Sequence, residues 1–489
     1  VPRSVRSARI TSRAWLDAQL MTVQNVRVNQ ERRRSYQAVA HLEDGGRVVQ
    51  LAHLDLPSVQ VPHGGTASVG IARDTERYGI ESSWESPNFT DVWLVDVGTG
   101  ERTLIMERTQ GNPSLSPDAA YLTWYEPADS TWYVREMASG EARVLGGDLP
   151  TPVWNVRNDT PSPAGSWGTA GWMEGDRAIL LYDQHDIWDV DPTGSRPSRN
   201  ITAGAGHDAD VRYRVLSSLG RDGSAAFSPN EEVWVSAFNF RTKAAGFARV
   251  RLDRSEAPRQ VIMEDRNFSN PVKAEDADRL LFTQETFVDF PDLWVSGMDF
   301  SDRRRVSHAN PQQDEYRWGT AELMEWISAD GIPLQGIVMK PEDFDPNRQY
   351  PMVVYFYERW SDGLHDHYAL VPHRSRIAFP MYTSNDYIVF IPDIVYRDGY
   401  PGEGGLNAVN PGIFKLIEQG FVDRERIALQ GHSWGGYQIA FMVTRSQNLY
   451  RAAAAGAPVA NMTSAYGGIR RETGLVRQFQ YERTQSRLG

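Results

Sequence analysis

The pattern of apolar and polar positions changes near residue 320. Between about residues 35 and 310, short runs of β-branched and aromatic residues alternate with polar positions and end in Gly, Pro, Asn or Asp, as in half-buried antiparallel strands. After residue 320 the apolar runs become continuous and alternate with helical stretches, which indicates a parallel sheet covered on both faces. We therefore predict an all-β part followed by an α/β part.

One sequence pattern recurs in the all-β part: a strand that contains Trp ends in an acidic or polar residue, and a small turn follows. It occurs at 91–96, 186–191 and 292–296. The spacing of such units is roughly 45 to 55 residues, the size of a four-stranded propeller blade. We predict a β-propeller over residues 1–320 with about six blades, with further blades upstream left open. A stacked pair of β-sandwiches is the alternative.

The α/β part begins with a predicted hairpin at 326–340, which contains an Asp-Gly turn. Buried strands are predicted at 352–357, 387–392, 426–430 and 452–455. Helices are predicted at 409–419, closed by Gly420 as a C-cap, and at 437–446. Residues 321–489 are assigned to this second domain.

Composition excludes several classes of function. A chain of 489 residues with 40% hydrophobic and 23% charged residues is globular and long enough for two domains. The net charge of −12 argues against a nucleic-acid partner. The absence of Cys excludes disulfides, thiolate metal sites and a Cys nucleophile. No apolar run reaches the length of about 18 residues that a membrane span needs.

The segment 431–436, Gly-His-Ser-Trp-Gly-Gly, has the Gly-x-Ser-x-Gly form of a nucleophile elbow. A buried strand is predicted before it and a helix after it, which is the context that the motif requires. Gly431 and Gly435 have no side chain, which leaves the room that a strained serine between them needs. Gly436 lets the helix approach the strand. Ser433 is therefore predicted to be a nucleophile.

The elbow, the hairpin at 326–340, the strand 350–357 and the loop 454–459 together resemble the prolyl oligopeptidase family of serine peptidases. The resemblance implies an N-terminal all-β propeller followed by a C-terminal α/β-hydrolase domain. It implies Ser433 as nucleophile, the backbone N–H of Trp434 as one oxyanion donor and the hydroxyl of Tyr357 as the second. The chain departs from the family just after Tyr357, where Glu358-Arg359-Trp360 replaces a small, Gly-rich continuation.

Substrate-binding residues are expected shortly after the 454–459 loop, where this chain has Met462 and Tyr466. The stretch lacks dense aromatics, so cleavage after proline is not expected. Glu231-Glu232 resembles the paired glutamates of dipeptidyl peptidases, but a solvated strand edge is the favoured interpretation. The histidines between 365 and 373 are interpreted as a solvated loop rather than a metal site, and His432 as a packing or hydrogen-bonding residue.

The family's triad follows the order Ser, Asp or Glu, His, yet no Asp or His lies between Trp434 and Gly489. We therefore expect an α/β-hydrolase domain truncated at its C-terminal end, with the triad Asp and His beyond residue 489. Such a piece of a longer protein is expected to be inactive alone. Neither compartment nor oligomeric state follows from the sequence.

The expected activity of the parent protein is hydrolysis of short peptides through an acyl-enzyme, with a peptide as partner and without metal or organic cofactor. An esterase or other acyl hydrolase on the same fold is one alternative. A propeller that only binds, carrying an inactive hydrolase domain, is the other.

Overall fold

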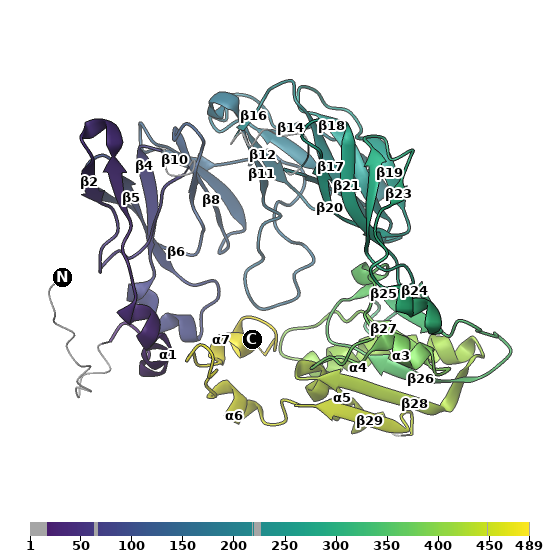
Figure 1. The fold of residues 1–489 in the computed structure, drawn as a ribbon. Coiled ribbons are helices and arrows are strands. Elements are labelled where there is room, and N and C mark those ends of the chain that lie inside the picture. Colours follow the sequence, from purple (N-terminus) through teal and green to yellow (C-terminus); the bar gives the residue numbers. More distant parts are fainter. Residues whose placement is uncertain (1–16, 63–66, 218, 220–225, 447, 489) are drawn as a thin grey trace.

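The computed structural model describes residues 17–62, 67–217, 219, 226–446 and 448–488. Sheets whose strand pairs are antiparallel, except for the parallel pair β11–β16, follow one another along an arc, and the α/β part adjoins the last of them (Figure 1). Helices α6 (Met462–Tyr466) and α7 (Gln478–Glu482) lie between the α/β part and the N-terminal helix α1 (Met21–Arg32). The hydroxyl of Thr22 on α1 donates to the carbonyl of Gly474 at 2.5 Å, which ties the two ends together.

The all-β part contains, among the described residues, five sheets of four or five strands and one two-stranded hairpin, against the expectation of about six units. The hairpin is β1 (Ala38–His41) and β2 (Arg47–Gln50). The first sheet holds β3 (Val59–Gln60), β4 (Val69–Asp74), β5 (Thr90–Asp96) and β6 (Arg102–Thr109). The second holds β7 (Ser114–Leu115), β8 (Tyr121–Glu126), β9 (Thr131–Glu136) and β10 (Ala142–Val144).

The third sheet holds β11 (Thr169–Met173), β12 (Ile179–Tyr182), β13 (Ile187–Val190), β14 (Arg199–Asn200) and β16 (Ala226–Phe227). The fourth holds β15 (Val211–Val215), β17 (Glu232–Asn239), β18 (Ala245–Arg251) and β19 (Arg259–Glu264), and helix α2 (Ala205–Ala209) precedes it. The fifth holds β20 (Asn267–Lys273), β21 (Arg279–Glu285), β22 (Asp292–Gly297) and β23 (Arg304–Arg305).

Each copy of the recurring Trp-containing pattern lies on the strand that comes third along the chain within its sheet, namely β5, β13 and β22. The structure adds that the aspartate at the first position of each segment is buried, at Asp91, Asp186 and Asp292. Asp91 accepts a hydrogen bond of 2.6 Å from the Tyr78 hydroxyl, and Asp186 one of 2.6 Å from the Thr202 hydroxyl. The repeat is therefore structural, because the acid ties its strand to a neighbouring loop.

The α/β part is built on one six-stranded sheet of order β24-β25-β27-β26-β28-β29. Its strands are β24 (Thr320–Ile327), β25 (Pro333–Lys340), β26 (Tyr350–Tyr355), β27 (Ile388–Pro392), β28 (Val422–His432) and β29 (Ala452–Gly456). The β24–β25 hairpin and the β25–β27 pair are antiparallel, and the remaining pairs are parallel. The predicted hairpin and four strands are confirmed, with their ends shifted by a few residues.

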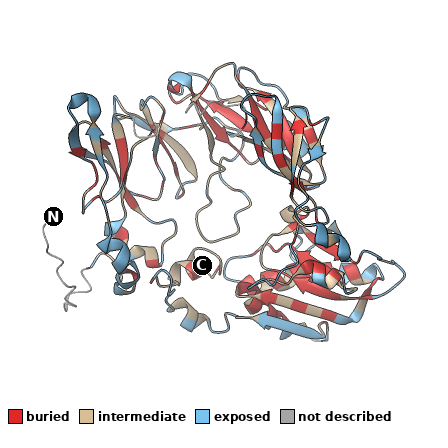
Figure 2. Ribbon diagram, in the orientation of Figure 1, coloured by how far each residue is buried: buried red, intermediate tan, exposed pale blue. Residues whose placement is uncertain are grey.

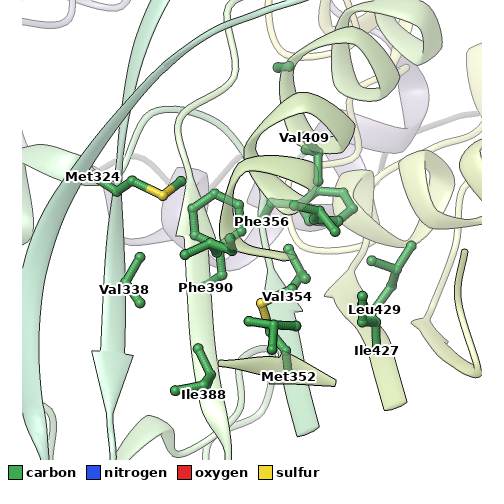
Figure 3. Packing of buried hydrophobic residues seen from close by; sticks show 14 of the residues in the cluster. Met324, Val338, Met352, Val354, Phe356, Ile388, Phe390, Val409, Ile427 and Leu429 are labelled. Atoms are coloured by element: carbon green, nitrogen blue, oxygen red, sulfur yellow. The ribbon is translucent and has the colours of Figure 1, made fainter. Parts of the chain in front are cut away.

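The core of the α/β part lies between this sheet and its helices α3 (Phe379–Thr383), α4 (Pro401–Glu418) and α5 (Trp434–Val443). Figure 3 shows Met352, Val354, Phe390 and Leu429 from neighbouring strands packed together beneath Val409 of α4. The inner strands are buried, whereas β29 at the end of the sheet is exposed (Figure 2).

Helix α4 starts at Pro401, eight residues before the predicted start at Val409, so that boundary was wrong. The Gly- and Pro-rich stretch before Val409 is also helical, and glycines along this helix are points of close contact. A Cβ on Gly402 would lie 2.6 Å from the Phe441 ring, and one on Gly412 would lie 2.8 Å from the Phe390 ring. Pro401 occupies the first turn, where no backbone N–H is needed.

Candidate active site

Ser433 stands at the junction between strand β28 and helix α5. Its φ of 57° and ψ of −110° lie outside the regions that non-glycine residues ordinarily adopt, and such strain is concentrated at functional sites. Its N–H donates to the Gly456 carbonyl at 2.8 Å, and its carbonyl accepts from the Tyr437 N–H at 3.1 Å. Hydrogen bonds on both sides therefore hold the strained turn.

Three glycines surround this serine at positions where a side chain has no room. A Cβ would lie 2.9 Å from the Gly435 carbonyl carbon if placed on Gly431, and 2.7 Å from the Phe356 carbonyl oxygen if placed on Gly435. A Cβ on Gly436 would lie 2.8 Å from the Gly456 carbonyl oxygen. All three obstacles are backbone atoms, so any larger residue would force the turn open.

Tyr357 follows the buried Phe356 just past the end of β26. Its hydroxyl forms a hydrogen bond with the Ser433 side chain of the elbow. Burial raises the pKa of the Tyr357 phenol, while hydrogen bonds with the Ser433 side chain, with Gln485 and with the Trp434 N–H act in the opposite direction. The two groups expected to stabilise an oxyanion, the Tyr357 hydroxyl and the Trp434 N–H, thus converge beside Ser433.

The backbone of Tyr357 is fixed by a buried pair of side chains. The Tyr396 hydroxyl donates to the Tyr357 carbonyl, and the Gln438 amide of helix α5 donates to that hydroxyl. Gln438 is fully buried, and burial raises the pKa of Tyr396, so this phenol stays protonated. The helix that carries the elbow therefore also positions the tyrosine.

The segment Glu358-Arg359-Trp360, where the sequence departs from the family pattern, links the two parts of the chain. Glu358 forms an ion pair with Arg487, with 3.1 Å between Oε1 and Nη1. Arg359 donates to the backbone carbonyl of Arg157 in the all-β part at 2.9 Å. The loop after Tyr357 is therefore held by contacts rather than by glycine-rich turn geometry.

Arg487 is a buried charge that sequence reasoning missed. Its side chain is 2% exposed and bridges Glu358 to Asp159, with 2.9 Å between Nη2 and the Asp159 Oδ1. Asp159 lies in a loop of the all-β part, more than three hundred residues away along the chain. No local pattern marks such a partner, because the contact depends on how the two parts meet.

The residues predicted to bind substrate lie on α6, after strand β29. Met462 packs partly against the core of the α/β part, and the Tyr466 hydroxyl donates to Glu482 of α7. Their roles in binding stay predictions. Of the Glu231-Glu232 pair, Glu232 is exposed at the start of β17 and forms an ion pair of 3.1 Å with Arg249 on the neighbouring strand.

The interpretation of residues 365–373 as a solvated loop was wrong for its first half. His365 and His367 are partly buried where the fifth sheet meets the α/β part, and His367 stacks on Trp318 with 5.3 Å between ring centroids. The Asp366 carboxylate accepts from the Asn267 amide of β20 at 2.6 Å. These residues therefore join the two parts of the chain.

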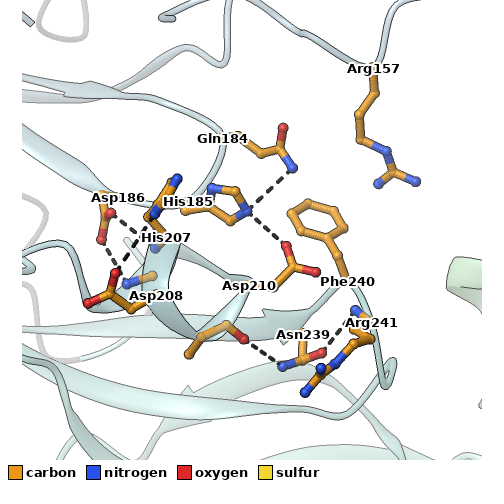
Figure 4. A network of polar contacts seen from close by, with 12 residues as sticks. Arg157, Gln184, His185, Asp186, His207, Asp208, Asp210, Asn239, Phe240 and Arg241 are labelled. Atoms are coloured by element: carbon orange, nitrogen blue, oxygen red, sulfur yellow. Dashed lines mark hydrogen bonds and ion pairs between the residues drawn. The ribbon is translucent and has the colours of Figure 1, made fainter. Parts of the chain in front are cut away.

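A His–Asp pair also occurs inside the all-β part. His185 Nε2 lies 3.0 Å from Asp210 Oδ1 at the end of helix α2, and its ring packs edge-on against Phe240 (Figure 4). The pair ties the β12–β13 turn to the α2–β15 junction, which is a structural task. Within the described ranges, no group of three or more His, Asp or Glu side chains is arranged to hold a metal ion.

No helix of the described part combines the length and the apolar character that crossing a bilayer requires.

Comparison with known proteins gives matches in both sequence and fold. Residues 406–481 match the family model of the prolyl oligopeptidase family. Mouse dipeptidyl peptidase 8 is 25% identical over 154 residues, which is 28% of this chain and 17% of that protein.

Two solved structures share the fold. Dipeptidyl peptidase 4 of Porphyromonas gingivalis aligns over 90% of this chain and 67% of its own, with a TM-score of 0.57 and 14% identity. Oligopeptidase B of Trypanosoma brucei aligns over 91% of this chain and 61% of its own, with a TM-score of 0.51 and 12% identity. The chain thus spans about two thirds of these structures and matches a much smaller share of the curated relative. The segment 406–481, which includes the elbow and the helices around it, is therefore similar to the prolyl oligopeptidase family of serine peptidases.

Proposed function

We propose that this chain carries the nucleophile and the oxyanion hole of a serine peptidase. The observation that supports the proposal most is the convergence of the Tyr357 hydroxyl and the Trp434 N–H beside the strained Ser433. Ser433 Oγ would attack the carbonyl carbon of a peptide bond, and these two donors would stabilise the negative charge that develops on its oxygen. One such donor contributes roughly 3 kcal/mol to transition-state stabilisation.

The proton of Ser433 needs a base, and the family's order places an Asp and a His after the serine. Because no Asp or His occurs between Trp434 and Gly489, we propose that both lie outside these 489 residues. The His would take the Ser433 proton and pass it to the leaving amine, while the Asp would hold the imidazole in the required orientation.

We further propose that the sheets of residues 1–320 are blades of a β-propeller and that residues 321–489 belong to an α/β-hydrolase domain. The propeller would cover the site and admit short or flexible peptides. Contacts between the two parts favour this arrangement: the buried Lys243 pairs with Asp362 at 2.7 Å, and Arg157 pairs with the same carboxylate at 3.1 Å.

The decisive experiment compares the 489-residue chain with the whole protein from which it comes. We expect the whole protein to cleave short peptide substrates and to react with a fluorophosphonate at Ser433. The Ser433→Ala variant should lose both properties, whereas Ser464→Ala, an exposed serine on α6, should keep them. The 489-residue chain alone should show no turnover and little labelling.

Each other outcome has a definite meaning. Full activity of the 489-residue chain would contradict a base outside it. Peptide cleavage that survives Ser433→Ala would refute the proposed nucleophile. Hydrolysis of small esters without cleavage of any peptide in a library would make the protein an acyl hydrolase, and inactivity towards both would favour a binding protein.

A further inference from the structure

The segment after helix α7 runs beside the Tyr357 hydroxyl and reaches it through Gln485. The Gln485 Nε2 donates a hydrogen bond to the phenolic oxygen of Tyr357. A phenol carries a single proton and accepts through its oxygen lone pairs. Because Gln485 occupies an accepting site, the Tyr357 proton is free to point away from Gln485, towards the side where the Ser433 side chain lies.

The direction of the Gln485 amide is set by a second glutamine. Gln480 on α7 is buried, and its Nε2 donates to Gln485 Oε1 at 2.9 Å. A reversed Gln485 amide would set two N–H groups against each other and turn its oxygen to Tyr357, where it would draw the phenolic proton away from Ser433. Gln480 therefore decides which end of Gln485 meets Tyr357.

The first donor of this chain of hydrogen bonds is an arginine. Arg470 Nη2 donates to Gln480 Oε1 at 2.6 Å. A guanidinium is permanently charged and only donates, so it fixes the orientation of Gln480 in turn. The donors then all run the same way, from Arg470 through Gln480 and Gln485 to Tyr357, and each bond polarises the next.

We propose that Gln480 and Gln485 are positioning residues which, with Arg470, form a donor relay that aims the Tyr357 proton at the oxyanion. The proposal deepens the proposed function and rests on it, since Tyr357 is the group that would contact the substrate. The relay supplies no proton and breaks no bond. It holds the phenol in the one orientation in which its O–H faces the reacting carbonyl.

The segment that carries the relay is anchored on both sides. Arg487, two residues after Gln485, is buried between Asp159 and Glu358. The Arg483 carbonyl accepts from the Ser162 N–H of the all-β part at 2.7 Å. Gln485 is thus held at Tyr357 by a fixed backbone rather than by its own hydrogen bond alone.

The first test reads the Tyr357 phenol directly and needs no turnover, so it applies to the 489-residue chain. 3-Fluorotyrosine is placed at position 357, and its ¹⁹F resonance is followed against pH. We expect Gln485→Met, which keeps the size but removes the donor, to raise the pKa of this phenol, because a donated hydrogen bond favours the phenolate. Gln480→Met and Arg470→Met should shift it the same way by less.

Matched controls separate the relay from general effects. Gln478→Met changes a glutamine on the same helix, and Arg471→Met removes an equal charge from the exposed neighbour of Arg470. Neither should move the resonance or its pKa. If Gln485→Met and Gln480→Met leave both unchanged while thermal unfolding shows an intact fold, the relay is refuted.

The second test uses steady-state kinetics of the whole protein. Gln485→Met should lower kcat/KM about 5-fold, mostly through kcat, because the transition state loses the stabilisation that one hydrogen bond provides. In a Tyr357→Phe background the same change should have no further effect, because the relay acts only through that hydroxyl. Equal losses in both backgrounds would show a merely structural role. Turnover that survives Ser433→Ala would instead refute the proposed function and leave the ¹⁹F result to judge the relay.

Discussion

The Tyr357 hydroxyl is the single group through which several separate parts of the chain act on the candidate site. Gln485 contacts its oxygen, Tyr396 holds its backbone, and the Ser433 side chain and the Trp434 N–H lie opposite. Removing the hydroxyl without the ring isolates its chemical contribution, because the packing of the ring stays.

We expect Tyr357→Phe to lower kcat/KM of the whole protein roughly 100-fold, the effect of losing one oxyanion donor. Tyr316→Phe, at a tyrosine that is 53% exposed, should leave kcat/KM unchanged. Both variants should melt near the wild-type temperature. A Tyr357→Phe enzyme with wild-type kcat/KM would remove this hydroxyl from the mechanism.

At the residue scale, the sequence identifies those site residues that lie close together along the chain. Ser433 and its three glycines stand within six positions, and their spacing alone indicates a strained turn. Gln485 and Arg487 carry no such signal. Their partners lie at separations of 128 and 328 residues, so only the folded arrangement brings them to the site.

Among the elements, helix α4 shows how close packing overrides intrinsic preference. Glycine ordinarily weakens a helix interior by about 1 kcal/mol relative to alanine. In α4 the absence of a Cβ at Gly412 is what lets the helix lie against Phe390. A pattern that counts glycines as helix breakers therefore places the start of this helix too late.

This packing predicts opposite effects for two alanine substitutions in α4. Gly412→Ala should lower the free energy of unfolding by about 1 to 3 kcal/mol, because the new methyl group overpacks a rigid contact. Gly405→Ala, whose Cβ would meet its nearest neighbour at an ordinary 3.5 Å, should leave stability unchanged or raise it. Urea unfolding of the two variants measures the difference, and equal effects would contradict the packing argument.

At the scale of the whole molecule, the contact between the fifth sheet and the α/β part contains two histidines whose pKa values are shifted. Burial lowers the pKa of both His365 and His367 below the usual 6.5. The unfolded chain then binds more protons than the folded one once the pH falls below 6.5, so the stability of this contact declines as the pH drops from there to the folded-state values.

Thermal melting should therefore begin at a lower temperature at about pH 5.5 than at about pH 7.5. The double variant His365→Gln, His367→Gln should reduce that difference. Burial raises the pKa of Glu285 and Asp366 in the same region, which has the opposite sign, so only the change caused by the histidine variant is diagnostic. A pH difference that the variant leaves intact would assign the effect to other groups.

The sequence predicts the division into an all-β and an α/β part because strand and helix periodicities differ throughout their lengths. It does not predict how the parts meet. Lys243 and Asp362 are ordinary charged residues in their local contexts, and their pairing depends on the relative placement of a sheet and a loop.

The exposed strand β29 has four consecutive alanines, Ala452 to Ala455, and these side chains do little to distinguish one register from the next. Backbone bonds at its two ends fix the alignment instead: Arg451 N–H to the Ile427 carbonyl, and Ser433 N–H to the Gly456 carbonyl, each at 2.8 Å. The elbow therefore also fixes the register of strand β29 against β28. Substitutions that relax the turn at Ser433 would free β29 to slide, and the loop that leads to Met462 would move with it.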